Sequence, residues 1–109
     1  MGLNQTFVAV EPQRAEIDAL AGATLLEFGA SWCEHCQAAQ PLIAAAFANH
    51  PAVRHIRVED GRGRPLGRSF AVKLWPSLIF LRDGKEVERL VRPHDATVIE
   101  QALARIDSL

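Results

Sequence analysis

Residues 25–36 read LLEFGASWCEHC and contain the most informative pattern of the chain. The run from Thr24 to Ala30 is apolar on both of its alternating faces, which is typical of a central strand covered by helices on both sides. Glu27 interrupts this run as its only charged residue. From Cys33 to Phe47, apolar residues recur at helical spacing. The segment therefore predicts a buried strand that ends just before a helix, with Cys33 at or near the helix N-cap.

Cys33 and Cys36 form a C-x-x-C pair at this junction of strand and helix. Unpaired backbone N–H groups and the positive end of the helix dipole stabilise a thiolate at a helix N-terminus, and the thiolate is the form that attacks a disulfide. We therefore expect Cys33 to be the nucleophile. Cys36 lies one turn further along the apolar face, where it can release a mixed disulfide by intramolecular attack, so we expect it to be the resolving thiol.

Other kinds of site also contain two cysteines at this spacing. Half of a zinc or iron–sulfur site is one alternative, but such sites normally have four ligands, and the remaining histidines, at positions 50, 55 and 94, have no ligand-like spacing. Attachment of c-type haem requires a histidine directly after the second cysteine, where this chain has Gln37. A buried, inert disulfide is disfavoured because cytosolic disulfides are seldom structural. We expect no metal and no cofactor beyond the redox-active pair itself.

Apolar runs elsewhere predict the rest of the architecture. The expected elements are, in chain order, a strand at 6–10, a helix at 12–20, the strand at 24–30, the helix from residue 33, a strand at 53–58, a hairpin of strands at 78–81 and 87–91, and a last helix capped by Asp95. Residues 60–68, in which glycine alternates with arginine, predict a surface loop. The order β-α-β-α-β, loop, β-β-α indicates an α/β fold, a mixed sheet between two helical layers, in a single domain spanning residues 1–109.

Composition and charge exclude several classes of function. Among 109 residues, 12 are basic and 13 acidic, so the net charge of −1 lacks the positive excess of a protein that binds nucleic acid or anionic membranes. The uncharged stretch 37–53 is interrupted by polar residues and prolines, so no membrane span is expected. The first ten residues do not resemble a secretory signal, which favours the cytoplasm; a leader removed upstream would indicate the periplasm instead.

The sequence assigns no chemical role to a cluster of basic residues or to two of the histidines. Half of the basic residues lie between Arg54 and Lys73, and such a run is usually a solvated face. His55 lies in an expected strand and His94 near the start of an expected helix. Nothing nearby in the sequence suggests a ligand or a base for either histidine.

The segment 25–36, together with Pro41, Trp75-Pro76-Ser77 and Asp83-Gly84, resembles the thioredoxin family in kind, order and spacing across nearly the whole chain. The resemblance implies a thioredoxin-like fold and a protein dithiol–disulfide oxidoreductase. It implies protein disulfides or dithiols as substrates, an unidentified redox partner, and a monomer. The alternative is a thioredoxin-fold binding or assembly module in which redox turnover is incidental.

The resemblance also implies roles for two residues outside the C-x-x-C pair. The Trp75–Pro76 bond is implied to be cis and to face the sulfurs, where the backbone of Trp75 would pair with a substrate strand; otherwise Pro76 is an ordinary first residue of a strand. Glu27 lies where the family commonly has a buried Asp that exchanges a proton with the resolving cysteine. The alternative for Glu27 is a structural ion pair with a neighbouring arginine such as Arg57.

His35 bears on the direction of electron flow. Thioredoxins usually have Gly-Pro between the cysteines, whereas protein disulfide isomerases and strongly oxidising bacterial relatives have a histidine just before the second one. A cation at this position stabilises the reduced thiolate and makes the disulfide a better oxidant, while Glu34 opposes the effect. We expect an intermediate potential, more oxidising than that of thioredoxin.

Three further residues are expected around the substrate groove. Trp32 is expected to cover the strand end and shield the disulfide. Trp75 stands where relatives usually have Ile, Val or Thr, so its indole should narrow the choice of partner. Arg92 stands near a common glycine that lines the same groove, which puts recognition by a standard thioredoxin reductase in doubt.

Overall fold

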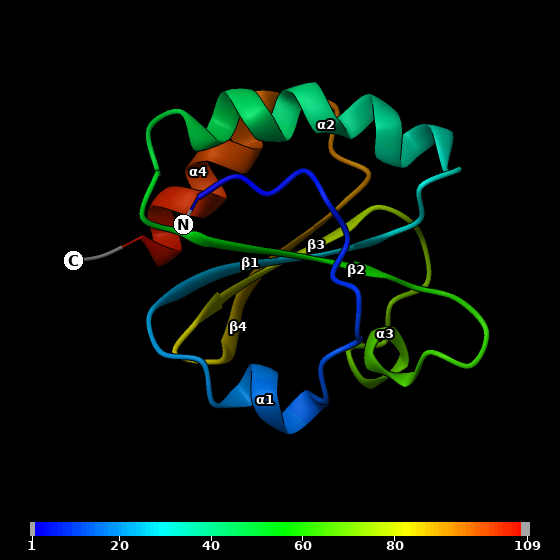
Figure 1. Ribbon diagram of the computed structural model, residues 1–109. Helices are drawn as coiled ribbons and strands as arrows, with labels where there is room; N and C mark the ends of the chain where they lie inside the picture. The colour runs from blue at the N-terminus through cyan, green and yellow to red at the C-terminus, as the bar shows by residue number, and fades with distance from the viewer. Residues whose placement is uncertain (1, 108–109) are drawn as a thin grey trace.

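A four-stranded mixed sheet lies between two layers of helices in the computed structural model, which describes residues 2–107 (Figure 1). The elements are α1 (Arg14–Asp18), β1 (Ala23–Gly29), α2 (Glu34–Phe47), β2 (Arg54–Glu59), α3 (Pro65–Ser69), β3 (Ser77–Arg82), β4 (Lys85–Val91) and α4 (Ala96–Ile106). Helices α2 and α4 cover one face of the sheet, and α1 and α3 cover the other. This architecture confirms the expected α/β, thioredoxin-like fold.

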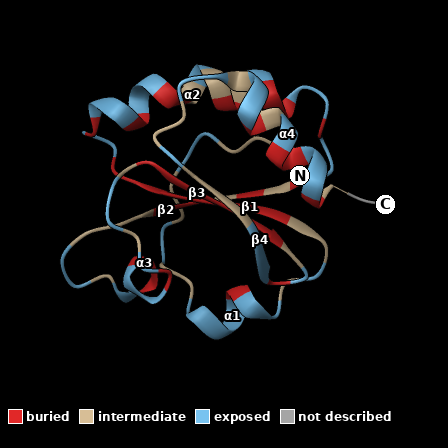
Figure 2. Cartoon of the chain, turned by 180° about the vertical axis from the view of Figure 1, so that it is seen from behind, coloured by how far each residue is buried: buried red, intermediate tan, exposed pale blue. Residues whose placement is uncertain are grey.

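Strand β1 lies in the interior of the sheet, whose order is β2-β1-β3-β4. It pairs parallel with β2 and antiparallel with β3, and β3 pairs antiparallel with β4. Side chains of a strand alternate between its faces, so Leu25 packs into the cluster under α2 and α4, whereas Leu26 and Phe28 pack into the cluster with α1 and α3. Figure 2 shows the resulting continuous burial along the central strands. Glu27 shares the face of Leu25 and therefore points toward α2.

Helix α2 begins as the sequence predicted. Cys33 is its N-cap, with extended backbone angles (φ −80°, ψ 118°), and its sulfur accepts a hydrogen bond from the Cys36 N–H. Pro41 lies inside the helix, which nevertheless continues to Phe47. The first helical turn therefore presents the C-x-x-C pair at the end of β1.

Two of the expected elements, the strand at 6–10 and the loop at 60–68, are wrong. Residues 6–10 form no strand: Val8 donates one backbone hydrogen bond to Arg57, and the segment then crosses from the α2 layer to the α1 layer (Figure 1). A ladder requires successive pairing, and this crossing prevents it. The expected loop at 60–68 contains the start of α3, which begins with Pro65 in the first helical turn, where its missing N–H needs no partner.

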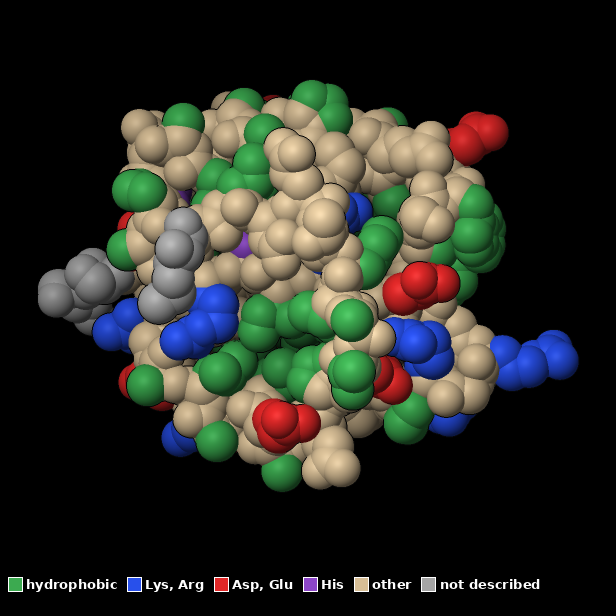
Figure 3. All heavy atoms as spheres, viewed as in Figure 1, with side chains coloured by type: hydrophobic (Ala, Val, Ile, Leu, Met, Phe, Trp, Pro, Cys, Tyr) green, Lys and Arg blue, Asp and Glu red, His purple; other side chains and the backbone are tan. Residues whose placement is uncertain are grey.

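Membrane insertion finds no support in the helices. Within residues 2–107, none of them combines the length and the apolarity needed to cross a bilayer. The surface seen in Figure 3 has basic, acidic and hydrophobic side chains interspersed, with no continuous basic patch on that face.

Candidate active site

Both cysteines are free and buried at the N-terminal end of α2. Cys33 keeps 7% of its surface exposed and Cys36 1%, so Cys33 is the more accessible of the two. The Cys33 sulfur lies 3.2 Å from the Cys36 backbone nitrogen that donates to it. Burial, followed by the hydrogen bond with Cys33, raises the pKa of the Cys36 thiol to about 12. Cys36 therefore holds its proton near neutral pH and needs a base before it can react.

Gly29, the last residue of β1, makes room for Cys36. A Cβ atom on Gly29 would lie 2.7 Å from the Cys36 sulfur, closer than real contacts of this kind. Helical and strand periodicity alone assign Gly29 no role. A glycine at the end of a buried strand is a recognised sign that another group approaches the backbone closely, and that signal was present.

An apolar rim surrounds the exposed side of the pair. Trp75 packs against a small buried cluster that contains both cysteines, and its indole N–H donates to an Asp60 carboxylate oxygen at 2.9 Å. Trp32 is 69% exposed and meets Trp75 edge to face, with ring centroids 5.5 Å apart. The Trp75–Pro76 peptide bond is cis. The structure thus places Trp75 beside the two cysteines, with the Trp32 ring against its indole and Pro76 next to it in the chain.

Arg92 forms two hydrogen bonds with the backbone of Trp75 and Pro76. Its own N–H donates to the Pro76 carbonyl at 3.0 Å, and its side-chain Nε donates to the Trp75 carbonyl at 2.7 Å. Its backbone has a positive φ of 51°, an uncommon conformation for a residue other than glycine. The resemblance implied a backbone at Trp75 that is open to a substrate strand, and here its carbonyl already has a side-chain partner.

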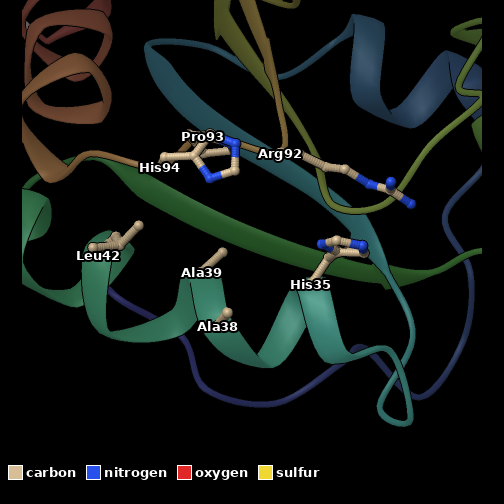
Figure 4. A pocket seen from close by; sticks show the side chains of 7 residues that line it. All are labelled: His35, Ala38, Ala39, Leu42, Arg92, Pro93 and His94. Carbon is tan, nitrogen blue, oxygen red and sulfur yellow. The ribbon is translucent and has the colours of Figure 1, made fainter.

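His35 points from α2 toward the segment that carries Arg92, Pro93 and His94 (Figure 4). Between them lies a hollow of about 250 Å³. His35 is exposed, as expected for a residue in the first turn of the helix. His94, for which the sequence suggested no role, lines the same hollow.

Glu27 is completely buried, and three side chains from other elements surround its carboxylate. Gln40 donates to Oε2 at 2.8 Å, His55 bonds Oε1 at 2.8 Å, and the Arg57 Nε lies 3.3 Å from Oε1. The Asn4 backbone N–H donates to His55 Nδ1 at 2.9 Å, so that nitrogen carries no proton and the ring donates through Nε2. His55 is therefore neutral, and one buried anion faces one buried cation.

This cluster corrects two interpretations of the sequence. The neighbouring sequence suggests no ligand or base for His55, yet its ring forms a hydrogen bond with Glu27. Arg57 was grouped with a solvated basic face, yet it is buried, donates to the Gln5 carbonyl and lies over the Phe7 ring. The expected contact between Glu27 and Arg57 is present, and the two residues are paired in the register of β1 and β2.

The cluster also extends toward the cysteines. Gln40 donates to the Cys36 carbonyl at 3.1 Å as well as to Glu27. The negative charge of Glu27 contributes to the raised pKa of the Cys36 thiol. The structure therefore contains both a buried ion pair of Glu27 with Arg57 and electrostatic coupling between Glu27 and Cys36.

For metal binding, residues 2–107 contain no group of three or more His, Cys, Asp or Glu side chains arranged to hold an ion. The chemistry that the arrangement supports is thiol chemistry. It combines a thiol at a helix N-cap, a second thiol that keeps its proton, and a carboxylate within electrostatic reach.

Comparisons with known proteins agree with this arrangement. The thioredoxin family model matches residues 7–105. Thioredoxin from Chlamydia trachomatis is 38% identical over 87 residues, which cover 78% of this chain and 84% of that protein. The solved structure of reduced thioredoxin 2 from Pseudomonas aeruginosa is 57% identical, with a TM-score of 0.85 and coverage of 95% of this chain and 96% of that one. Protein disulfide-isomerase A2 from Pongo abelii is 38% identical over 89 residues, which make up 17% of that protein.

Proposed function

The chain belongs to the thioredoxin family, and from this premise we propose that it exchanges a dithiol and a disulfide with protein substrates through Cys33 and Cys36. One observation carries the proposal: the Cys33 sulfur caps α2 and accepts the Cys36 N–H, while the pKa of Cys36 is raised to about 12. Backbone N–H donors and the helix dipole favour negative charge on Cys33, and burial disfavours it on Cys36. The two thiols are thereby assigned different tasks.

Reduction of a substrate proceeds in two exchanges. The Cys33 thiolate attacks one sulfur of a substrate disulfide, the substrate S–S bond breaks, and the other substrate sulfur leaves as a thiolate that takes a proton from solvent. Cys36 then loses its proton and attacks the Cys33 sulfur, which releases the second substrate sulfur. Two electrons have passed to the substrate, and the protein holds a Cys33–Cys36 disulfide. A dithiol reductant, the proposed redox partner, restores the thiols, so no other cofactor is needed.

We propose that Glu27 assists removal of the Cys36 proton. The coupling between the two groups and the bridge through Gln40 support this role. The contact with Arg57 supports the structural alternative. A buried carboxylate that is held by donors on both oxygens can serve both purposes, and the two roles respond differently to the variants developed in the Discussion.

The groove beside Cys33 is the proposed docking site for a substrate polypeptide. Trp32, Trp75 and Pro76 form its apolar rim, and Trp75 fills more of it than a smaller side chain would. A bulky rim narrows the set of polypeptides that fit. We propose that Arg92 also lines this groove.

We further propose that the disulfide is more oxidising than that of thioredoxin. Protonated His35 in the first turn of α2 would add to the helix dipole in stabilising the reduced thiolate. Equilibration with glutathione tests this, with an expected potential above the value of about −270 mV typical of thioredoxin. A value at or below that one would reject the proposal without affecting the thiol chemistry.

Two variants test the function itself. Wild-type protein should catalyse insulin-disulfide reduction, and Cys33→Ser should abolish the catalysis, whereas a rate that is unaffected by Cys33→Ser would indicate the binding module instead. Cys36→Ser should accumulate mixed disulfides through Cys33 in cells, and capture of none would count against the enzyme. The captured proteins would also identify the compartment, for which we propose the cytoplasm, where such cysteine pairs are more often catalytic than structural.

A further inference from the structure

We propose that the hollow between α2 and the segment after β4 binds an acidic side chain of the substrate polypeptide, with Arg92 as the residue that selects it. The inference rests on the proposed function, because it concerns a side chain of the polypeptide that reacts at Cys33. It adds a substrate class: polypeptides that carry Asp or Glu close to the reacting cysteine.

The lining of the hollow is basic on its polar side. Its polar side chains are His35, Arg92 and His94, and the remainder of the lining consists of Ala, Leu and Pro side chains. Among the described residues, no carboxylate lines it. Among residues 2–107, none of these three side chains forms an ion pair with Asp or Glu. Arg92 is half-buried, and an anion bound in the hollow would give it a charged partner.

Arg92 also changes what the groove offers to a substrate backbone. An extended substrate would pair with the Trp75 backbone through a carbonyl that accepts hydrogen bonds. The Arg92 Nε already donates to that carbonyl at 2.7 Å. A guanidinium has five N–H donors in a planar fork. The Arg92 side chain therefore presents donors at the position where the Trp75 carbonyl would otherwise present an acceptor. Carboxylate oxygens accept from such a fork better than any neutral group of a polypeptide.

The location of the hollow ties it to the reacting sulfurs. His35 lies between the two cysteines in sequence, and Arg92 holds the Trp75–Pro76 backbone beside them. Figure 4 shows the Arg92 side chain extending above His35 and away from Pro93 and His94. A polypeptide whose cysteine reaches Cys33 would therefore place neighbouring side chains over this hollow. Those that carry a carboxylate gain an interaction with Arg92.

Two disulfide-linked peptides that differ only in Asp or Asn beside the reactive cysteine provide the test. The full-length protein, recycled with dithiothreitol, should reduce the Asp peptide with a kcat/KM about tenfold higher at low ionic strength, as a charge-assisted hydrogen bond predicts. Added salt should shrink the ratio, because the hollow is open to solvent. The preference should fall to near one in Arg92→Gln and be largely kept in Arg92→Lys.

Lys85→Gln is the matched control, because it removes one positive charge at the opposite end of β4. It should keep the full preference for the Asp peptide. Equal rates for the two peptides in the wild type, or an unchanged preference in Arg92→Gln, would overturn the inference. The ratio is internal to each variant, so a general loss of folded protein does not alter it. If neither peptide is reduced in a Cys33-dependent manner, the proposed function itself has failed.

Discussion

Replacement of Glu27 by alanine is expected to destabilise the protein more than removal of any surface carboxylate. The substitution leaves the buried Arg57 guanidinium without its counter-ion and the His55 Nε2–H without its acceptor. Loss of one partner from a buried charge pair costs roughly 3–5 kcal/mol, because the other charge stays buried. Against a typical stability of about 5–15 kcal/mol, this is a large fraction.

Urea and thermal denaturation measure the loss. For a chain of this length we expect the urea midpoint to fall by about 2 M and the melting temperature by roughly 15–30 °C. Glu86→Ala is the control, since Glu86 also pairs with an arginine, Arg89, at 2.8 Å but at the surface. It should lose less than about 1 kcal/mol. A loss that small in Glu27→Ala would refute the reasoning, because Arg57 and His55 would then have found water.

Glu27→Gln separates the structural role from the chemical one. It keeps an oxygen for His55 and a similar shape, but it removes the charge opposite Arg57 and cannot accept a proton at neutral pH. If Glu27 deprotonates Cys36, this variant should accumulate the Cys33 mixed disulfide in stopped-flow exchange. If the carboxylate is only an ion-pair partner, stability should fall while the rate of the second exchange in the remaining folded protein stays unchanged.

Three further outcomes are expected. Gly29→Ala should cost about 1–3 kcal/mol in urea denaturation, because its Cβ would lie 2.7 Å from the Cys36 sulfur; an unchanged midpoint would contradict that contact. Limited alkylation near neutral pH, mapped by mass spectrometry, should modify Cys33 first and leave the Cys36 thiol unmodified, since the pKa of Cys36 is about 12. Equal labelling of the two cysteines would contradict the proposal that they have different tasks. Burial disfavours the His50 cation, but hydrogen bonds to Asp107 and Glu100 outweigh it and raise the pKa of His50 above 6.5. The stabilisation by the His50 cation is therefore complete below pH 6.5 and is lost as the pH rises through the raised pKa. His50→Gln should flatten the dependence of the free energy of unfolding on pH in that window. An unchanged slope would show that His50 does not titrate against these carboxylates.

Local patterns account for the elements that the sequence predicted correctly. The buried run at 24–30, the N-cap at Cys33 and the cap at Asp95 all depend on neighbours within a few residues, and the structure has β1, α2 and α4 there. The hairpin around Asp83-Gly84 follows the same logic, because its turn requires positive φ at both residues.

Elements that depend on distant contacts were predicted poorly. Helix α3 has only five residues, too few to be stable alone, and its Leu66 packs into the cluster shared with α1 and β1. The segment 6–10 has strand composition, but its one backbone bond to β2 and the crossing to the other layer are properties of the folded chain. Propensity alone cannot anticipate either.

The same distinction divides the site. The C-x-x-C pair and its helix start are contiguous in sequence, so their chemistry can be predicted from residues 25–36. The surroundings of Glu27 require the register of two parallel strands, which pairs Glu27 with Arg57 and places His55 two residues earlier on the same face. A buried carboxylate in one predicted strand, next to a strand with alternating His and Arg, is a signal that could have suggested the cluster.

Arg92 shows where selectivity enters a shared mechanism. Nothing in its local sequence predicts a bond to the Trp75 carbonyl, because that bond joins the ends of β4 and β3 across the cis proline. Thiol exchange needs the sulfurs, the helix N-terminus and a base, and the groups that we propose for these roles lie on β1, on α2 and at the N-cap of α2. The residues that we propose distinguish one polypeptide from another lie instead on the neighbouring segments, where Trp75 packs beside the cysteines and Arg92 lines the hollow. Substitutions of Trp75 or Arg92 should therefore change which substrates are reduced. Substitutions of the cysteines should instead abolish the reduction of every substrate.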